Sequence, residues 1–232
     1  HPKKRGQAKQ GKKGDRYFLN DETIPAPFFD ARLLLAIDIG NTSISYGLFM
    51  NHKIIRKWFD GIDVIPKISH YINNSGIKCN KLQVIVDSVN PKILKSVILM
   101  LKRAFHNYRL YVLGRDISVK IKHNYNNINN LGKDRVANIY GAIRKYRLPA
   151  IVIDLGTATT FDYISKGGVF EGGLIIPGME ISLEALGDRT ALLPKIKHPV
   201  AARSLMGRTT KDGMMAGLMQ GTGAMLDGLI ER

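Results

Sequence analysis

Apolar and polar residues alternate in short runs from Leu33 onward, and the period of alternation switches between that of a strand and that of a helix. The first three runs read as successive strands joined by short turns, and helical and strand patterns then alternate. The expected strands cover 33–39, 43–49, 52–59, 81–89 and 109–114. The expected helices cover 65–73, 91–105 and 134–146, the second with a proline in its first turn.

The pattern restarts near Pro149 with three further runs of strand character. They cover 148–156, 159–165 and 168–178, and helices are expected at 181–186 and 211–230. The chain thus contains two successive sets of strands and helices, and each set opens with three strands. This arrangement predicts an α/β fold of two related halves with a central cleft. We expect a basic, flexible extension at 1–31, an N-terminal subdomain at 32–148 and a C-terminal subdomain at 149–232.

Each half opens with the same kind of turn. AIDIGNTSISYGLF carries Asp38 and Gly40 between two strands, and AIVIDLGTATTFDYI carries Asp154 and Gly156 in the equivalent place. Glycine lets backbone amides approach a ligand closely, and the hydroxyl groups that follow can donate to phosphate oxygens. The carboxylates would repel a bare phosphate but suit Mg²⁺ shared with it. The alternative is an Asx-type turn at each strand end, but its repetition in two equivalent places favours phosphate binding.

Neither a Walker sequence nor GxGxxG after a strand occurs, so a P-loop or Rossmann site is unsupported. The phosphate site is therefore expected to be of the β-hairpin type found in the actin, Hsp70 and sugar kinase superfamily.

Two further segments bear on the chemistry. In YNNINNLGKDRVAN, Asp134 at a helix start can accept a proton from a substrate hydroxyl, and Arg135 can hold a carboxylate bidentately. The plainer alternative is a helix N-terminal acid beside a solvated arginine. The segment GGLIIPGMEISLEALGDRTALLP is too rich in Gly and Pro for a plain helix, and predicts a shaped loop beside the cleft. Glycines 213, 217 and 221 form a small-residue face for close helix packing, within the chain or across a dimer.

The formal charge of +16 raises the question of nucleic-acid binding. Eight basic and four acidic residues lie in the first 32, and 27 basic and 15 acidic residues follow. The basic residues of the body are dispersed and form no recognition helix or aromatic-basic platform, so nucleic acid is not an expected partner.

No apolar run reaches the roughly 20 residues of a membrane helix, and the first residues lack the apolar core of a secretory signal. The single cysteine, Cys79, fits a packing role in a reducing cytoplasm.

Taken together, the motifs resemble type III pantothenate kinase, from Leu33 to the C-terminus. The matching segments are DIGNTSISYGLF, YNNINNLGKDRVAN, DLGTATTFD, GGLIIPGMEISLEAL, RTALLP, MGRTT and GLMQGTGAMLDGLIER. The resemblance implies two ribonuclease H-like (actin-like ATPase) domains, and transfer of the ATP γ-phosphate to pantothenate in the first step of coenzyme A synthesis. It also implies a homodimer, Mg²⁺, and potassium or ammonium as a monovalent cation.

The resemblance also implies roles for individual residues. Asp134 is the implied general base, Asp38 lies beside Mg²⁺, and Asp154 binds the monovalent cation. The implied ATP contacts are Asp38, Ile39, Gly40, Asn41, Thr42, Ser43, Ile44, Ser45 and Thr157. The implied pantothenate contacts are Tyr125, Gly132, Lys133, Asp134, Arg135 and Thr210. Two positions depart from the family pattern: Ile128 follows Asn127 where proline is usual, and Lys133 stands where a small or apolar residue is usual.

Two other functions stay open at this point. A regulatory or transcriptional accessory protein on the same fold would suit the basic charge of the body, although Asp38, Asp134, Arg135 and Asp154 argue against lost catalysis. A different kinase or phosphatase of the superfamily would act on another small molecule.

Overall fold

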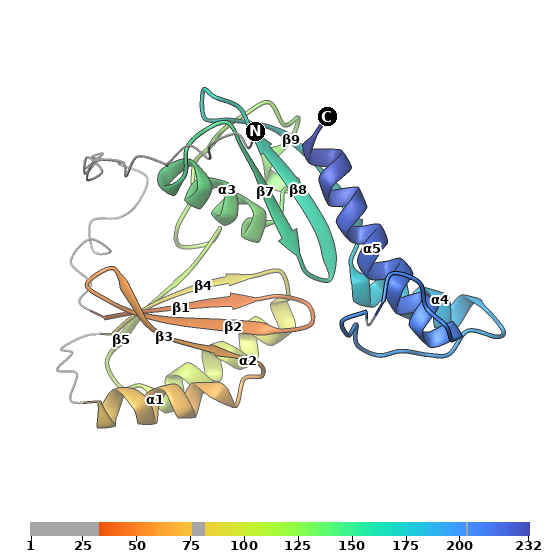
Figure 1. The fold of residues 1–232 in the computed structure, drawn as a ribbon. Coiled ribbons are helices and arrows are strands. Elements are labelled where there is room, and N and C mark those ends of the chain that lie inside the picture. Colours follow the sequence, from red (N-terminus) through yellow and green to blue (C-terminus); the bar gives the residue numbers. More distant parts are fainter. Residues whose placement is uncertain (1–32, 76–81, 203) are drawn as a thin grey trace, which may run out of the picture.

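The computed structural model describes residues 33–75, 82–202 and 204–232. The expected N-terminal extension and Cys79 lie outside these residues. The first half is a five-stranded sheet in the order β3-β2-β1-β4-β5 (Figure 1). Its strands are β1 (Leu33–Ile39), β2 (Ile44–Met50), β3 (Lys53–Phe59), β4 (Leu82–Ser88) and β5 (Tyr108–Val112). The first three strands pair antiparallel, whereas β4 lies parallel to β1 and β5 parallel to β4.

Helices α1 (Val64–Asn74) and α2 (Pro91–Ala104) cover the face of this sheet that points away from the second half (Figure 1). Strand β1 alternates as the sequence predicts, and Leu33, Leu35 and Ile37 are buried in the core beneath the helices. Helix α2 begins where expected because the side chain of Asn90 accepts hydrogen bonds from the amides of the second and third helical residues, both at 3.2 Å.

The second half is a four-stranded sheet in the order β6-β9-β8-β7. Its strands are β6 (Lys122–His123), β7 (Ala150–Leu155), β8 (Ala158–Ile164) and β9 (Val169–Pro177). Helix α3 (Lys133–Lys145) packs on β7 and β8, and buries Val136 and Ile139 against Ile164 and Phe170. Strand β6 pairs in this sheet and α3 packs on it, although both precede residue 149. The strand pairing therefore does not coincide with the expected boundary at 148/149, which stays a prediction.

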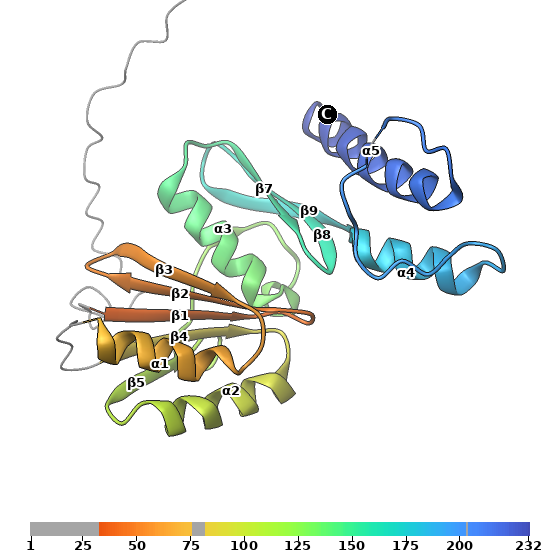
Figure 2. The same cartoon turned by 60° about the horizontal axis from the view of Figure 1, so that its bottom comes forward.

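Helices α4 (Met179–Arg189) and α5 (Thr210–Ile230) pack against each other and stand to one side of the two sheets (Figure 2). Their small shared core contains Leu183, Met214 and Met215. The expected shaped loop over this region is therefore wrong in part. Strand β9 continues to Pro177, and α4 is a regular helix, because after Gly178 the segment carries good helix formers such as Leu183 and Glu184.

The predicted fold class is confirmed. Both halves contain three successive antiparallel strands whose first turn carries the Asp-x-Gly sequence, and the order β3-β2-β1-β4-β5 is that of the ribonuclease H-like fold. Two short features of the Asn-rich loop were not predicted, β6 and a 3₁₀ turn at Ile128–Asn130.

Candidate functional site

The two Asp-x-Gly turns meet across the halves of the molecule. The tip of the β7–β8 hairpin points towards the β1–β2 turn (Figure 1), and the hydroxyl oxygens of Thr42 and Thr157 lie 2.9 Å apart in a hydrogen bond. Each turn is closed by its own backbone hydrogen bond, donated by the amides of Gly40 (3.0 Å) and Gly156 (3.1 Å). Two hairpins separated by 115 residues therefore present their hydroxyl groups to one place.

Three of the predicted carboxylates gather at the same place. The pKa of Asp38 is raised by partial desolvation of its carboxyl group, and further by the negative charges of Asp134 and Asp154. The pKa of Asp154 is raised by desolvation, then by Asp134 and Asp162. Carboxylates that disfavour one another's ionised form create a strong preference for a bound cation.

Sequence reasoning missed a fourth carboxylate, that of Asp87. This residue is the last but one of β4 and pairs in register with Asp38 on the neighbouring parallel strand. Desolvation raises the pKa of Asp87 to about 6, the charge on Asp38 adds to the rise, and nearby Lys133 opposes it. The available signal was topological: acids at the carboxyl ends of adjacent parallel strands face one crevice. It was missed because VDSVNP reads equally well as a strand end before a helix cap.

Asp134 lies in the first turn of α3, directly after two residues that shape its surroundings. Its Oδ1 accepts a hydrogen bond from the amide of Arg135 at 2.8 Å. A Cβ atom on Gly132 would overlap this oxygen, so the carboxylate folds back over the glycine. The helix start therefore holds Asp134 towards the other carboxylates, in a position from which it can accept a proton.

Arg135 is buried, with only 8% of its surface exposed, and it forms an ion pair with Asp162 of β8. The interpretation of Arg135 as a solvated arginine beside a helix acid is therefore wrong. Its predicted contact with a substrate carboxylate stays a prediction.

Three other predicted substrate residues lie in different environments. Tyr125 is half-buried, and its ring packs against Phe170 with 5.6 Å between centroids. Lys133 lies close enough to the acid cluster to lower the pKa of Asp87. Thr210 is exposed at the start of α5, and none of the described hydrogen bonds or ion pairs joins it to the cluster.

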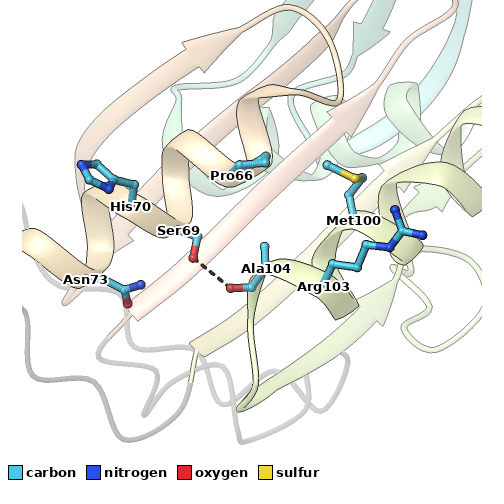
Figure 3. A pocket seen from close by; sticks show the side chains of 7 residues that line it. All are labelled: Pro66, Ser69, His70, Asn73, Met100, Arg103 and Ala104. Carbon is cyan, nitrogen blue, oxygen red and sulfur yellow. Dashed lines mark hydrogen bonds between the residues drawn. The ribbon is translucent and has the colours of Figure 1, made fainter.

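Two hollows are present on the N-terminal half. One of about 330 Å³ opens beside the β1–β2 turn and is lined by Thr42 and Ser43 together with Lys92 and Ser96 of α2. The other, of about 380 Å³, lies between α1 and α2 on the helix-covered face, and contains none of the predicted site residues (Figure 3).

The described residues contain no group of three His, Cys, Asp or Glu side chains arranged to hold a metal ion. One or two carboxylates from Asp38, Asp87 and Asp154 remain for each cation, and phosphate oxygens would have to supply other ligands. Mg²⁺ is commonly bound in this way, so the residues fit a cation that arrives with a nucleotide.

Comparisons with known proteins agree with this chemistry. A sequence model of the family described as Type III pantothenate kinase matches residues 34–232. The Type III pantothenate kinase of Citrifermentans bemidjiense is 34% identical over 212 residues, which cover 86% of this chain and 81% of that protein. The enzyme of the same name from Persephonella marina is 33% identical over 210 residues, with the same coverage. The Type III pantothenate kinase of Listeria monocytogenes is 32% identical over 206 residues, which cover 85% of this chain and 79% of that protein.

Solved structures resemble the chain only distantly. The ethanolamine utilization protein EutJ from Carboxydothermus hydrogenoformans has a TM-score of 0.40 at 11% identity, covering 72% of this chain and 58% of that one. The Ppx/GppA enzyme of Aquifex aeolicus has a TM-score of 0.33 at 12% identity, covering 63% and 53%. These scores add nothing to the fold derived above, whereas the family match spans nearly all of the described residues. The chain belongs to the type III pantothenate kinase family.

Proposed function

We propose that the protein phosphorylates the primary hydroxyl of pantothenate with ATP, forming 4'-phosphopantothenate in the first step of coenzyme A synthesis. The observation that carries the proposal is the meeting of the two Asp-x-Gly hairpins through Thr42 and Thr157, with Asp134 within electrostatic reach of both turns.

ATP would lie with its phosphates between the hairpins. The hydroxyls of Thr42 and Thr157, which bond each other in the structure, would turn to phosphate oxygens when the nucleotide binds. Asp38 to Ser45 and Thr157 form this phosphate site. Mg²⁺ beside Asp38 and a monovalent cation beside Asp154 would neutralise the charge that builds up on the phosphates in the transition state. Phosphoryl transfer depends mainly on alignment and charge neutralisation, so this environment matches the reaction.

Asp134 accepts the proton of the pantothenate hydroxyl as the bond to phosphorus forms. A carboxylate suits this role because proton loss occurs late in a loose transition state and needs no strong base. Gly132, Lys133, Arg135 and Tyr125 would surround the pantothenate.

We place Thr210 in the site of a second copy of the chain, in a homodimer. It lies on α5, and added Cβ atoms at Gly213, Gly217 and Gly221 would meet nothing within 4 Å. Gly207 packs against the backbone of Gly213, but none of the described residues lies over the Cβ positions of these three glycines.

The cytoplasm is the compartment that fits an ATP-dependent enzyme with a single cysteine. None of the described helices is long and apolar enough to cross a membrane. The charge of the body suits anionic small substrates, and nucleic acid is not proposed as a partner.

An ADP-release assay with and without pantothenate, repeated without potassium, tests the proposed function. We expect ADP release to require pantothenate and to fall when monovalent cations are removed. A regulatory protein would release no ADP under any of these conditions. A superfamily enzyme with another substrate would show ATP turnover that pantothenate does not change, and either result would reject the proposal.

A further inference from the structure

A buried ion pair ties the start of α3 to the second sheet. Nε of Arg135 lies 3.2 and 3.1 Å from the two carboxylate oxygens of Asp162, and Nη2 lies 2.5 Å from Oδ1. Arg135 is 8% exposed and Asp162 is 1% exposed. The desolvation of two buried charges offsets much of their mutual attraction, so such a pair is a poor source of net stability. Its geometry is the more informative property.

The pair is held from three elements. Arg135 belongs to α3, Asp162 to β8, and Gly173 lies opposite Asp162 in the register of β8 with β9. A Cβ atom at Gly173 would overlap Nη2 of Arg135 and Oδ1 of Asp162, as well as a backbone carbonyl. The guanidinium and carboxylate therefore occupy the space over this glycine, where they have little freedom to shift.

The first turn of α3 depends on this anchor. Gly132 at the N-cap supplies no side-chain hydrogen bond to the helix. The amide of Arg135 instead donates to Asp134, and the Arg135 side chain runs to Asp162. The orientation of the Asp134 side chain is thus linked to β8. This strand forms a hairpin with β7, which carries Asp154, and Thr157 lies in the turn between the two strands.

We propose that Asp162 is a positioning residue for the reaction: through Arg135 it fixes the helix start so that the carboxylate of Asp134 faces the two phosphate-binding turns. The proposal rests on the proposed function of Asp134 as general base. A displacement of about 1 Å in a reacting group is enough to slow catalysis by about 100-fold, so the anchor is expected to act on turnover.

The first test compares Asp162→Asn with wild type, at a temperature where both are folded by circular dichroism. We expect kcat to fall by about 10- to 100-fold, with the KM values for pantothenate and ATP changed less than about threefold. Asp188→Asn is the matched control, because it removes the same charge from the exposed pair with Lys195 (2.6 Å), and it should keep wild-type kinetics. A raised pantothenate KM with unchanged kcat would overturn the proposal, since the pair would then serve substrate binding.

The second test keeps the fold while removing the pair. Replacement of both partners by apolar residues of similar volume, Arg135→Met with Asp162→Leu, is expected to restore the melting temperature relative to Asp162→Asn. If Asp162 positions the base, kcat at saturating pantothenate stays low in this stable variant, whereas loss of the proposed Arg135 contact with pantothenate would by itself raise only KM. Recovery of kcat together with stability would show a purely structural pair and overturn the inference. A wild-type protein without pantothenate-dependent turnover would instead reject the proposed function.

Discussion

Single residues set the close approach of the carboxylates at the active site. Asp38 and Asp87 pair in register on adjacent parallel strands, which lie about 4.8 Å apart, so their side chains leave the sheet on the same face. Burial and mutual repulsion oppose ionisation of these groups, and a cation relieves both effects. The site is therefore expected to lower the stability of the free protein and to become favourable when its ligands bind.

The substitution Asp87→Asn tests whether the ionised carboxylates lower the stability of the free protein, through the pH dependence of that stability. The pKa of Asp87 in the folded state, about 6, lies above its ordinary value of 3.8. The stability that its protonated form contributes is present below about pH 4 and is lost as the pH rises through about 6. The substitution should raise the free energy of unfolding by about 1–2 kcal/mol at pH 8, after allowing for solvent screening, and change it little at pH 4. Urea denaturation at the two pH values measures this, and equal effects would contradict it.

Gly132→Ala tests the place of the Asp134 carboxylate. The backbone of Gly132 has φ −52° and ψ 140°, which alanine adopts readily, so the variant should fold. The added methyl group would overlap Oδ1 of Asp134 and turn the carboxylate away, and we expect kcat to fall by about 10- to 100-fold.

Gly141→Ala in the same helix is the matched control for this substitution. An added Cβ there meets nothing within 4 Å, so activity should stay normal, with a gain in stability of about 0.5–1 kcal/mol. Steady-state kinetics measure kcat for both variants. Unchanged kcat in Gly132→Ala would show that Asp134 does not need its observed position.

At the scale of elements, most strands and helices could be predicted because their periodicity is strong. Strand β1 alternates strictly, and α2 carries an Asn-Pro start that the structure uses as a cap. Strand β6 has two residues, too few to show a period. The helix expected at 181–186 is present but is longer, because α4 begins directly after the Gly and Pro residues that precede it. Asp38, Asp134 and Asp154 could be named from turns and helix starts, whereas Asp87 and Asp162 depend on strand register, which the sequence does not reveal.

The junction between β9 and α4 supports the β7–β8 turn, the second of the two proposed phosphate-binding turns. The amide of Gly178 donates to the carbonyl of Thr157 at 3.1 Å, and a Cβ on Gly178 would overlap the carbonyl oxygens of Gly156 and Thr157. Gly178→Ala should therefore distort this turn and weaken ATP binding roughly tenfold, or about 1.4 kcal/mol. Calorimetric titration with ATP measures the change. Gly167→Ala, where the added atom meets nothing within 4 Å, is the control. Equal ATP affinity in the two variants would contradict the role of the junction.

At the scale of the whole molecule, α4 contacts β8, and α5 packs on α4 to one side of the sheets (Figure 2). Added Cβ atoms at Gly217 and Gly221 of α5 would meet nothing within 4 Å. Thr210 at the start of α5 has no described bond to the acid cluster, and the proposed homodimer would bring it to the pantothenate site of a second copy. Neither the proposed dimer nor its proposed contribution to the site could be derived from hydrophobic pattern alone, because a small-residue face packs equally well within one chain.

Gly221→Arg tests the dimer. The residue is exposed and an added Cβ atom meets nothing within 4 Å among the described residues, so the variant should fold. Across a close helix contact, however, a bulky charged group is costly, and we expect the mass measured by sedimentation equilibrium to fall from two chains to one. The pantothenate KM should rise as the Thr210 contact is lost. Gly167→Arg, in a turn away from α5, should leave the mass unchanged, and an unchanged mass for Gly221→Arg would exclude the face as the interface.

The most direct test of the central claim is formation of 4'-phosphopantothenate by the wild type and by Asp134→Asn, with ATP binding measured on both. The wild type should form the product only when ATP and pantothenate are both present. Asp134→Asn should fold, bind ATP with similar affinity and lose turnover by about 100-fold or more, because the hydroxyl proton has no acceptor. No product from the wild type, or wild-type turnover in Asp134→Asn, would contradict the account.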